Sequence, residues 1–464
     1  MNISIKNFGP IKQFDFDLTK DIIVTYGENN IGKSYAMQIV YLLLKNLNEY
    51  AEFYNGFYGY SYAAQLRFHS NHLDKMKQVV DGFSKSADST REITEEMNAA
   101  VLVDLIDKFI SNFLNSCENT FGNFKSILTQ HPSIELEVGN YRLIISLADE
   151  QPLKAHLYST PTFLKRASSD FHKSRNANGK LDIYYYKDVA DPLDIISYRI
   201  IEAITAFTVE VSTVVGNVYF LPASRSGIYS GMSAFSSIIA ELSKNKAFLT
   251  KKLELPGISE PISDYFLMLS GIRSKENSAY SEIYKKIESD ILNGTVSFNR
   301  SRNTLVYTPD GLDHEFDMTE VSSMVSEISP IVAFLKYIIS SNNYRRTKIQ
   351  KATPIVFIEE PEAHLHPKNQ IKLIAMFAQL HNLGIKIIVS SHSNYIFNKL
   401  NNLLLKEEIS LQVYSAILLQ AEAGGSKSNF MAGDELGIDD TNFMDVTQEL
   451  YNERENLIDM WNNQ

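Results

Sequence analysis

The stretch Tyr26-Gly27-Glu28-Asn29-Asn30-Ile31-Gly32-Lys33-Ser34 fits the G-x-x-x-x-G-K-[ST] pattern of a phosphate-binding loop. Residues 21–26 before it are mostly apolar and predict a buried strand. Residues 34–47 after it are apolar nearly all round, which predicts a central helix. Strand, glycine loop and helix are the context that the motif requires. The alternative is that the glycines only form a turn into a core helix.

The residue types of this loop suit a triphosphate. Glycines let successive backbone N–H groups turn toward phosphate oxygens, and the helix N-terminus adds the positive end of its dipole. Lys33 is expected to reach the β- and γ-phosphates, and the Ser34 hydroxyl to take one position on Mg²⁺. The sequence therefore predicts ATP and Mg²⁺ as cofactors, with these residues at the nucleotide: Gly27, Asn29, Asn30, Ile31, Gly32, Lys33, Ser34 and Tyr35.

The composition is that of an ordinary soluble globular protein, with 44% hydrophobic and 21% charged residues. Its 464 residues are too many for one core, so two or three lobes are expected. The net charge of -11 argues against a surface that is basic overall, so DNA would need a local groove or another subunit.

The cysteine content and the N-terminus indicate a cytoplasmic protein. Cys117 is the only cysteine, which excludes an internal disulfide and a cysteine metal cluster. Residues 1–6 lack the apolar core of a signal peptide, and the apolar run 328–340 is too short to cross a bilayer. No membrane partner is expected.

Periodicity divides the chain into an ATPase head with two helical insertions. Apolar residues at helical spacing in 98–127 mark the first insertion, and a second helical region follows residue 233. The expected division is head 1–50, insertion 51–131, head strands and loops 132–232, insertion 233–293 and head 294–464.

Several shorter elements are expected within these parts. Residues 2–26 alternate as three short strands, and Gly139-Asn140 joins two strands into a hairpin. Further strands are expected at 218–225 and within 296–317, and a strong helix at 322–340.

The run 164–181 contains several basic residues and is expected to be a polar loop. It is more often solvated than bound to a phosphate backbone.

A second group of chemical side chains follows two apolar strands late in the chain. Residues 354–360 end in Glu359 and Glu360, and residues 385–392 end in His392, with one helix between them. This pattern predicts a right-handed βαβ unit with parallel strands. Because ligands bind at the carboxyl edge of such sheets, the three side chains are expected beside the phosphate loop.

These residues have a shared chemical interpretation. Glu359 is expected to hold Mg²⁺ through water, and Glu360 to polarise the attacking water. His392 is expected to bond the γ-phosphate or orient that water, so the expected catalytic residues are Glu360, His392 and Lys33. The alternative is a solvated strand end.

His364 and His366 raise the separate possibility of zinc. They diverge on a helix and have no cysteine or third histidine nearby, so a structural turn is the preferred interpretation.

The string Ile358-Glu359-Glu360-Pro361-Glu362-Ala363-His364-Leu365-His366-Pro367, followed by Ser390-Ser391-His392-Ser393-Asn394, resembles the ABC-type ATPases of the overcoming-lysogenization-defect (OLD) branch. These are related to RecF, Rad50 and SMC heads. The resemblance covers residues 1–47 and 320–400. It implies an α/β fold: an ABC-type P-loop ATPase head with a mixed sheet and large helical insertions.

The resemblance also implies a head-to-tail homodimer or higher homo-oligomer, with each nucleotide between one phosphate loop and the partner's signature helix. The matching segment is residues 320–325, in which Ser322 and Ser323 are placed to cap a γ-phosphate. Met324 stands where the family usually has glycine. The family's Q-loop glutamine has no assigned match, and the turn Ala223-Ser224-Arg225 resembles a family element near the site.

The tail is short for a further domain. Full-length OLD proteins carry a C-terminal TOPRIM nuclease of roughly 100 residues, whereas residues 393–464 must also complete the ATPase sheet. The acidic run 434–440 is expected to be a turn before a terminal helix at 445–461, not a metal site.

A head without a nuclease resembles the ATPase subunits of two-gene anti-phage systems of the PARIS and Septu types. We therefore expect an ATP-hydrolysing sensor and scaffold that controls a separate effector, a nuclease or toxin, with a phage-encoded trigger. The alternatives are a RecF/SMC-like DNA-repair ATPase, which needs a basic groove, and a protein in which ATP only holds an assembly together.

Overall fold

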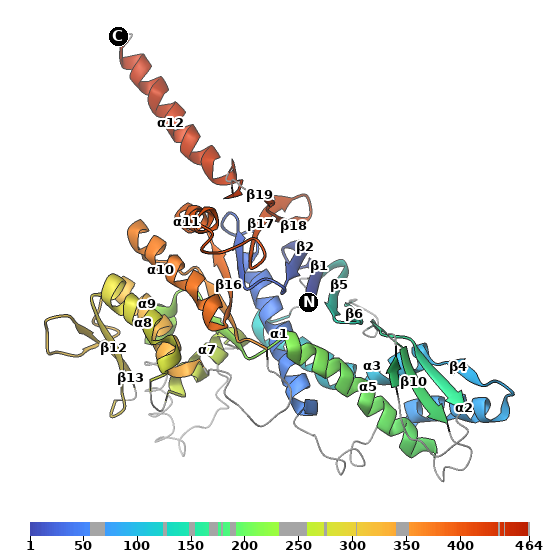
Figure 1. Cartoon of the computed structure of the whole chain (residues 1–464). Helices are drawn as coiled ribbons and strands as arrows, with labels where there is room; N and C mark the ends of the chain where they lie inside the picture. Colours follow the sequence, from blue (N-terminus) through green and yellow to red (C-terminus); the bar gives the residue numbers. More distant parts are fainter. Residues whose placement is uncertain are drawn as a thin grey trace, which may run out of the picture.

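The computed structural model describes residues 1–55, 70–123, 128–147, 154–166, 175–177, 180–185, 192–231, 258–272, 276–302, 304–339, 352–434, 437–439 and 441–462. An eleven-stranded sheet runs through it (Figure 1). In order across the sheet, the strands are β11 (Val218–Leu221), β15 (Ile355–Glu359), β16 (Lys386–Ser391), β3 (Ile22–Tyr26), β17 (Tyr414–Glu422), β18 (Gly425–Phe430), β2 (Ile11–Asp17), β1 (Asn2–Phe8), β5 (Leu128–Val138), β6 (Tyr141–Ser146) and β7 (Lys154–Tyr158).

This sheet is mixed. Neighbours from β11 to β17 are parallel, whereas β17 and β18, β2 and β1, and the strands onward to β7 pair antiparallel. The change of direction separates a parallel half from an antiparallel half, and the two join where β18 runs parallel to β2.

Each central strand contributes to two cores because successive side chains point to opposite faces. In β16, Ile388 belongs to one buried cluster while Ile387 and Val389 belong to the other. Phe357 of β15 faces the same way as Ile388. Strands buried on both faces read as continuous apolar runs, which is why these segments do not alternate in polarity.

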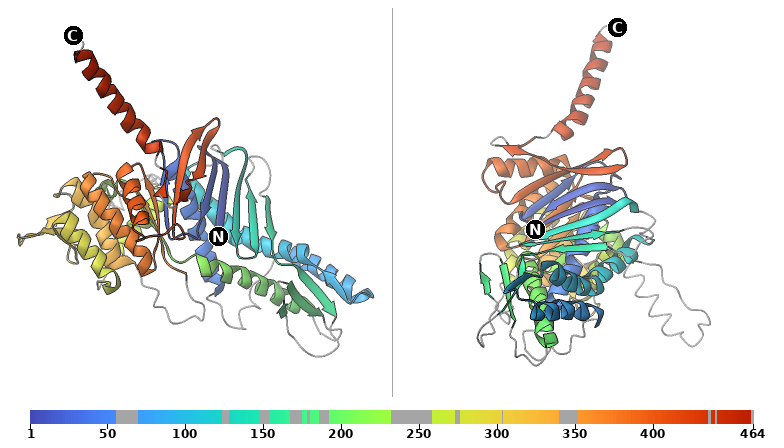
Figure 2. Two further views of the ribbon diagram at one scale, coloured as in Figure 1. Left: turned by 45° about the horizontal axis from the view of Figure 1, so that its top comes forward. Right: turned by 90° about the vertical axis from the view of Figure 1, so that its right-hand side faces the viewer.

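Helices cover both faces. One cluster contains α1 (Lys33–Asn55), α2 (Ser70–Lys85), α3 (Thr94–Asp104), α4 (Ser111–Phe121) and α5 (Pro192–Val214). The other contains α7 (Glu260–Ser270), α8 (Ser281–Ile287), α9 (Ser323–Ala333), α10 (Pro367–Leu380) and α11 (Asn394–Leu405). The result is a three-layer α/β head, visible from two further sides in Figure 2.

Several sequence predictions are confirmed. The strand, loop and helix around the phosphate loop are β3 and α1, and the βαβ unit is β15, α10 and β16. The hairpin through Gly139 is the antiparallel pair β5–β6. The strands expected within 296–317 are β12 (Gly294–Asn299), β13 (Thr304–Pro309) and β14 (Phe316–Asp317).

The predicted loop at 164–181 is wrong in its described part. A second sheet contains β4 (Thr90–Glu92), β8 (Thr162–Arg166), β10 (Lys180–Tyr185) and β9 (Arg175–Ala177). The strands were not predicted because β8 and β10 are stabilised by parallel pairing with each other. The basic composition of each segment gives no sign of that pairing. His172 and Lys173 lie outside the described residues.

Two further expectations need correction. The region 132–232 was predicted to hold only strands and loops, but α5 spans 23 of its residues. Its buried side chains Ile200, Ile204, Phe207 and Val211 recur at helical spacing. The first insertion is not wholly helical either, since β4 and the start of β5 fall within 51–131. Residues 232–257 of the second insertion lie outside the description.

The tail completes the sheet, as predicted, because β17 pairs with β3 and β18 with β2. A small pair, β19 (Gly433–Asp434) with β20 (Gly437–Ile438), then leads to α12 (Thr441–Asn462), which projects away from the head (Figures 1 and 2). Within the described chain, no cluster of three or more His, Cys, Asp or Glu side chains suits a metal ion. No described helix is long and apolar enough to span a membrane.

Candidate nucleotide-binding site

Strand register brings the two halves of the predicted site together. β16 lies between β3 and β15 and runs parallel to both, with Ser391 beside Tyr26 and Ser390 beside Glu359. The phosphate loop, Glu360 and His392 therefore leave the sheet at the same carboxyl edge. This is the edge at which parallel sheets bind ligands.

The phosphate loop requires glycine at two positions. Gly27 has φ 146°, and a Cβ there would lie 2.5 Å from the carbonyl oxygen of Leu419 in β17. Gly32 has φ 94°, and its Cβ would lie 2.9 Å from side-chain atoms of Pro10 and Ile11. The backbone conformation at both positions disfavours a side chain, and neighbouring atoms leave no space for one. The loop therefore packs directly against Leu419, Pro10 and Ile11.

Lys33 is buried and already hydrogen-bonded. Its Nζ donates to the carbonyl oxygens of Gly27 at 2.8 Å and Glu28 at 2.5 Å, and lies 3.0 Å from Nδ1 of His392. Burial lowers the pKa of Lys33 to about 8, although nearby carboxylates, led by Glu360, oppose the shift. A phosphate arriving beside this group would raise its pKa again, because a nearby negative charge favours the ammonium form.

Glu360 and His392 form a pair at this edge. Nε2 of His392 lies 3.2 Å from Oε1 of Glu360, and this hydrogen bond is the main reason that the pKa of Glu360 is lowered. Since Lys33 can only donate to Nδ1, the network assigns the neutral imidazole's proton to Nε2. Glu360 has φ 42°, a conformation that costs energy and is typical of functional positions.

Glu359 is 3% exposed and lies next to Ser34. Burial raises the pKa of Glu359 to about 7, opposed first by the N–H of Ala223 and then by the Ser34 hydroxyl. Oε2 accepts that N–H at 3.3 Å, but Oε1 is buried with no hydrogen-bond partner in the described structure. A hydroxyl beside a carboxylate with an unused oxygen fits the donors that Mg²⁺ prefers.

The other residues expected at the nucleotide differ in their exposure and packing. The ring of Tyr35 stacks on Phe121 of α4 at 4.6 Å between centroids, which leaves its backbone for a nucleotide. Asn29 and Asn30 are exposed, while Ile31 is buried in the core that contains α1.

Ser322 and Ser323 start α9 at the exposed surface. The Ser322 hydroxyl accepts the N–H of Val325 as the helix N-cap. No described hydrogen bond joins either serine to the phosphate loop of the same chain.

Glu362 was not singled out by the sequence reasoning, although it lies within the quoted string. Its Oε1 accepts the hydroxyl of Ser391 and the N–H of His392, each at 2.7 Å. It therefore fixes the end of β16 from which the imidazole projects. The signal was available, because a carboxylate two residues after Glu360 follows a strand that ends at the same edge.

Glu327 was missed by the sequence reasoning, which noted Arg225 only as part of a turn resembling a family element near the site. Both side chains are fully buried, and Nε of Arg225 lies 3.4 Å from Oε2 of Glu327. The guanidinium donates to the carbonyls of Glu359 at 2.8 Å, Glu360 at 3.3 Å and Pro222 at 3.0 Å. Because Glu327 belongs to α9, this ion pair connects α9 to the end of β15.

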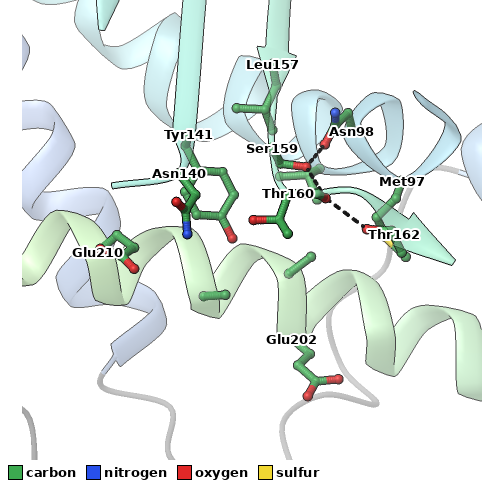
Figure 3. A pocket seen from close by; sticks show the side chains of 13 residues that line it. Met97, Asn98, Asn140, Tyr141, Leu157, Ser159, Thr160, Thr162, Glu202 and Glu210 are labelled. Atoms are coloured by element: carbon green, nitrogen blue, oxygen red, sulfur yellow. Dashed lines mark hydrogen bonds between the residues drawn. The ribbon is translucent and has the colours of Figure 1, made fainter. Parts of the chain in front are cut away.

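A separate cavity of about 210 Å³ lies between α3, the β5–β6 hairpin and α5 (Figure 3). Tyr141, Glu202 and Glu210 contribute polar groups, and Met97 and Leu157 contribute apolar ones. None of its lining residues belongs to the nucleotide site, so the phosphate chemistry does not use it.

The sequence matches the family model described as an AAA ATPase domain over residues 1–397. The chain belongs to this family. It is an ATPase, and its head has the ABC-type α/β fold that the sequence predicted, with the mixed sheet and helical insertions described above. The ATPase family implies nucleotide binding at this site.

Solved structures similar to this ATPase are heads of SMC proteins. One is the SmcHead bound to the C-winged helix domain of ScpA, at 10% identity and TM-score 0.38, covering 93% of this chain and 97% of that chain. The SMC head domain from Thermotoga maritima has 8% identity and TM-score 0.36, covering 93% and 98%. A Pyrococcus furiosus Smc head has 12% identity and TM-score 0.35, covering 97% and 98%. No curated protein matches the sequence.

Proposed function

We propose that this ATPase binds MgATP between two copies of the chain and hydrolyses it with Glu360 as general base. One observation carries the proposal: Lys33, His392 and Glu360 form a continuous chain of polar contacts at the carboxyl edge of the sheet. The lowered pKa keeps Glu360 ionised at neutral pH, so that it can accept a proton from water.

The contacts of Lys33 suggest what ATP changes. In the described state the ammonium group is satisfied by two loop carbonyls and by His392. A γ-phosphate is a stronger acceptor and would draw Lys33 away from the imidazole. Nδ1 of His392 would then be free to accept a hydrogen bond from the attacking water, while Nε2–H still orients Glu360.

Ser34 and Glu359 are the residues proposed to hold Mg²⁺. When bound, the ion would neutralise charge on the β- and γ-phosphate oxygens. The orphaned Oε1 of Glu359 gives this assignment structural support. Mg²⁺ keeps much of its hydration shell, so the carboxylate is expected to act through water.

The second copy is proposed to close the site from the side of α9. Ser322 and Ser323 present an exposed helix N-terminus, which suits a phosphate bound on the partner. Met324 is partly exposed, and its sulfur lies 3.4 Å from Nδ2 of Asn369. A side chain at this position limits how closely the partner backbone approaches, so we expect slow turnover.

The biological role proposed is that of a sensor and scaffold in a bacterial anti-phage system. ATP-dependent dimerisation would control a separate effector, a nuclease or toxin. The motif string from Ile358 to Pro367 supports this role through its resemblance to the OLD branch. Co-expression with the product of an adjacent gene, followed by an assay of its nuclease activity with and without ATP, tests the role directly.

Two variants test the ATPase proposal. Glu360→Gln should retain ATP binding but slow phosphate release by roughly 10²- to 10⁴-fold, the usual contribution of a general base. It should accumulate the closed oligomer in size-exclusion chromatography. Lys33→Ala should not bind ATP and should elute as the nucleotide-free protein. Glu408→Gln, at an exposed position on the head, is the matched control.

Three results would redirect the proposal. An oligomer that responds to neither variant contradicts the sandwich. Unchanged phosphate release by Glu360→Gln means that ATP only holds an assembly together. ATP-dependent, salt-sensitive binding to DNA ends would favour the DNA-repair alternative, against which the net charge of -11 counts.

A further inference from the structure

The terminal helix α12 exposes apolar side chains to an unusual degree. Every residue from 448 to 461 is exposed. Large apolar side chains among them include Leu450, which is 62% exposed, and Trp461, which is 79% exposed, together with Tyr451, Leu457, Ile458 and Met460. A solitary helix is marginal in water and gains most of its stability from packing an apolar face. This helix therefore needs a partner.

The apolar residues form a seam of the kind that pairs with another helix. Leu450, Arg454, Leu457 and Trp461 follow one another at steps of four, three and four residues. This spacing places them along one side of the helix, where a second helix can pack. Tyr451 and Ile458 widen the same side.

The charges at the middle of the seam identify the partner. Glu453 and Arg454 are adjacent and of opposite sign, and their midpoint is equally distant along the chain from Leu450 and Leu457. In a two-fold pair, residue i meets j while j meets i. An antiparallel pair centred there sets Leu450 against the second copy's Leu457, and Glu453 beside its Arg454, twice.

We propose that α12 pairs antiparallel with α12 of a second copy of this chain. A parallel, in-register pair would instead bring the two Arg454 side chains together in the seam, which like-charge repulsion opposes. The stretch 448–461 carries four acidic residues and one basic residue, so two copies repel each other overall, and placing each Arg454 beside the other copy's Glu453 reduces this repulsion at the seam.

This contact is distinct from the proposed ATP sandwich. It uses no residue of the nucleotide site, so it should persist without ATP and in Lys33→Ala. Together the two contacts would link head-to-tail dimers into a larger assembly. If an experiment rules out the α12 contact, the ATP sandwich is unaffected, and the reverse is also true. The two contacts can therefore be tested separately.

Sedimentation velocity of the full-length Lys33→Ala protein, without nucleotide and over a range of concentrations, tests the pairing. We expect a dimer that Leu450→Asp combined with Leu457→Asp converts to monomer. Arg454→Glu or Glu453→Arg alone should weaken it by about threefold to tenfold, the scale of two exposed ion pairs. The double exchange Glu453→Arg with Arg454→Glu should restore it. Asp459→Arg, on the opposite side of the helix, is the control.

Cysteine cross-linking tests the direction of pairing. Cys117 is buried, so an introduced thiol is the accessible one. In the antiparallel pair, two Leu450→Cys thiols lie about 10 Å apart along the axis, beyond disulfide reach. A mixture of Leu450→Cys and Leu457→Cys proteins should therefore cross-link, and Leu450→Cys alone should not. Cross-linking by Leu450→Cys alone, a protein that is monomeric at every concentration, or a dimer indifferent to the aspartate variants would overturn the proposal.

Discussion

Replacing Arg225 by methionine should destabilise the head strongly. The side chain is fully buried, and its guanidinium serves four backbone carbonyls and the carboxylate of Glu327. Methionine fills similar space but donates to none of them. Burial lowers the pKa of Arg225, and the charge of Glu327 opposes this shift. The ion pair therefore offsets the desolvation cost of both charges. Removing one partner leaves the other charge buried without compensation.

The magnitude follows from what is left unpaired. Breaking a buried ion pair by removing one partner costs about 3–5 kcal/mol. Glu327 keeps its bonds from the N–H of Arg225 and from the N–H and hydroxyl of Ser226, which favours the lower part of this range. Glu327→Gln in the same protein removes the uncompensated charge but keeps an acceptor for Ser226. The double variant should therefore regain part of the loss.

Chemical unfolding followed by circular dichroism measures both variants against the parent. We expect Arg225→Met to lower the free energy of unfolding by about 3 kcal/mol or more. The double variant should be about 1 kcal/mol more stable than the sum of the two single changes predicts. A loss below 1 kcal/mol for Arg225→Met, or strict additivity, would refute the view that this pair links α9 to the end of β15. Lys406→Met on the exposed surface is the control.

Three further outcomes follow from the site. Because the pKa of Lys33 is about 8 and phosphate would raise it, ATP binding above pH 8 should take up a proton, seen by calorimetry in buffers of different ionisation heat. The pKa of Glu359 is raised from 4.5 to about 7, so its contribution to stability is present below pH 4.5 and lost as pH rises through 7; Glu359→Gln should flatten this trend by about 3 kcal/mol in pH-dependent unfolding. Glu362→Ala should lower kcat more than it changes KM in steady-state assays, because His392 loses the acceptor of its N–H.

The sequence predicted the parts of the fold whose signals are local. The phosphate loop and the strand before Glu359 carry their own motif or apolar run, and both lie where they were expected. The basic strands β8 and β10 were missed because pairing between two separate segments stabilises them, not their own polarity pattern. α5 was missed although Ile200, Ile204, Phe207 and Val211 carry a helical pattern.

The site showed the same limit. Motif residues were recognised by type and spacing, whereas Arg225 and Glu327 are separated by 102 positions and meet only in the folded head. Neither has a local pattern that marks it as buried, since arginine and glutamate are usually on the surface. Glu362 was visible in the string, but its bonds to the end of β16 depend on the βαβ geometry.

The position of β17 has a consequence for synthesis on the ribosome. This strand pairs with β3, and its Leu419 carbonyl lies against Gly27 of the phosphate loop. The nascent chain thus exposes the apolar edge of β3 until almost four hundred further residues have been translated. Unpaired apolar strands of this kind aggregate readily, so emerging chains should be clients of chaperones.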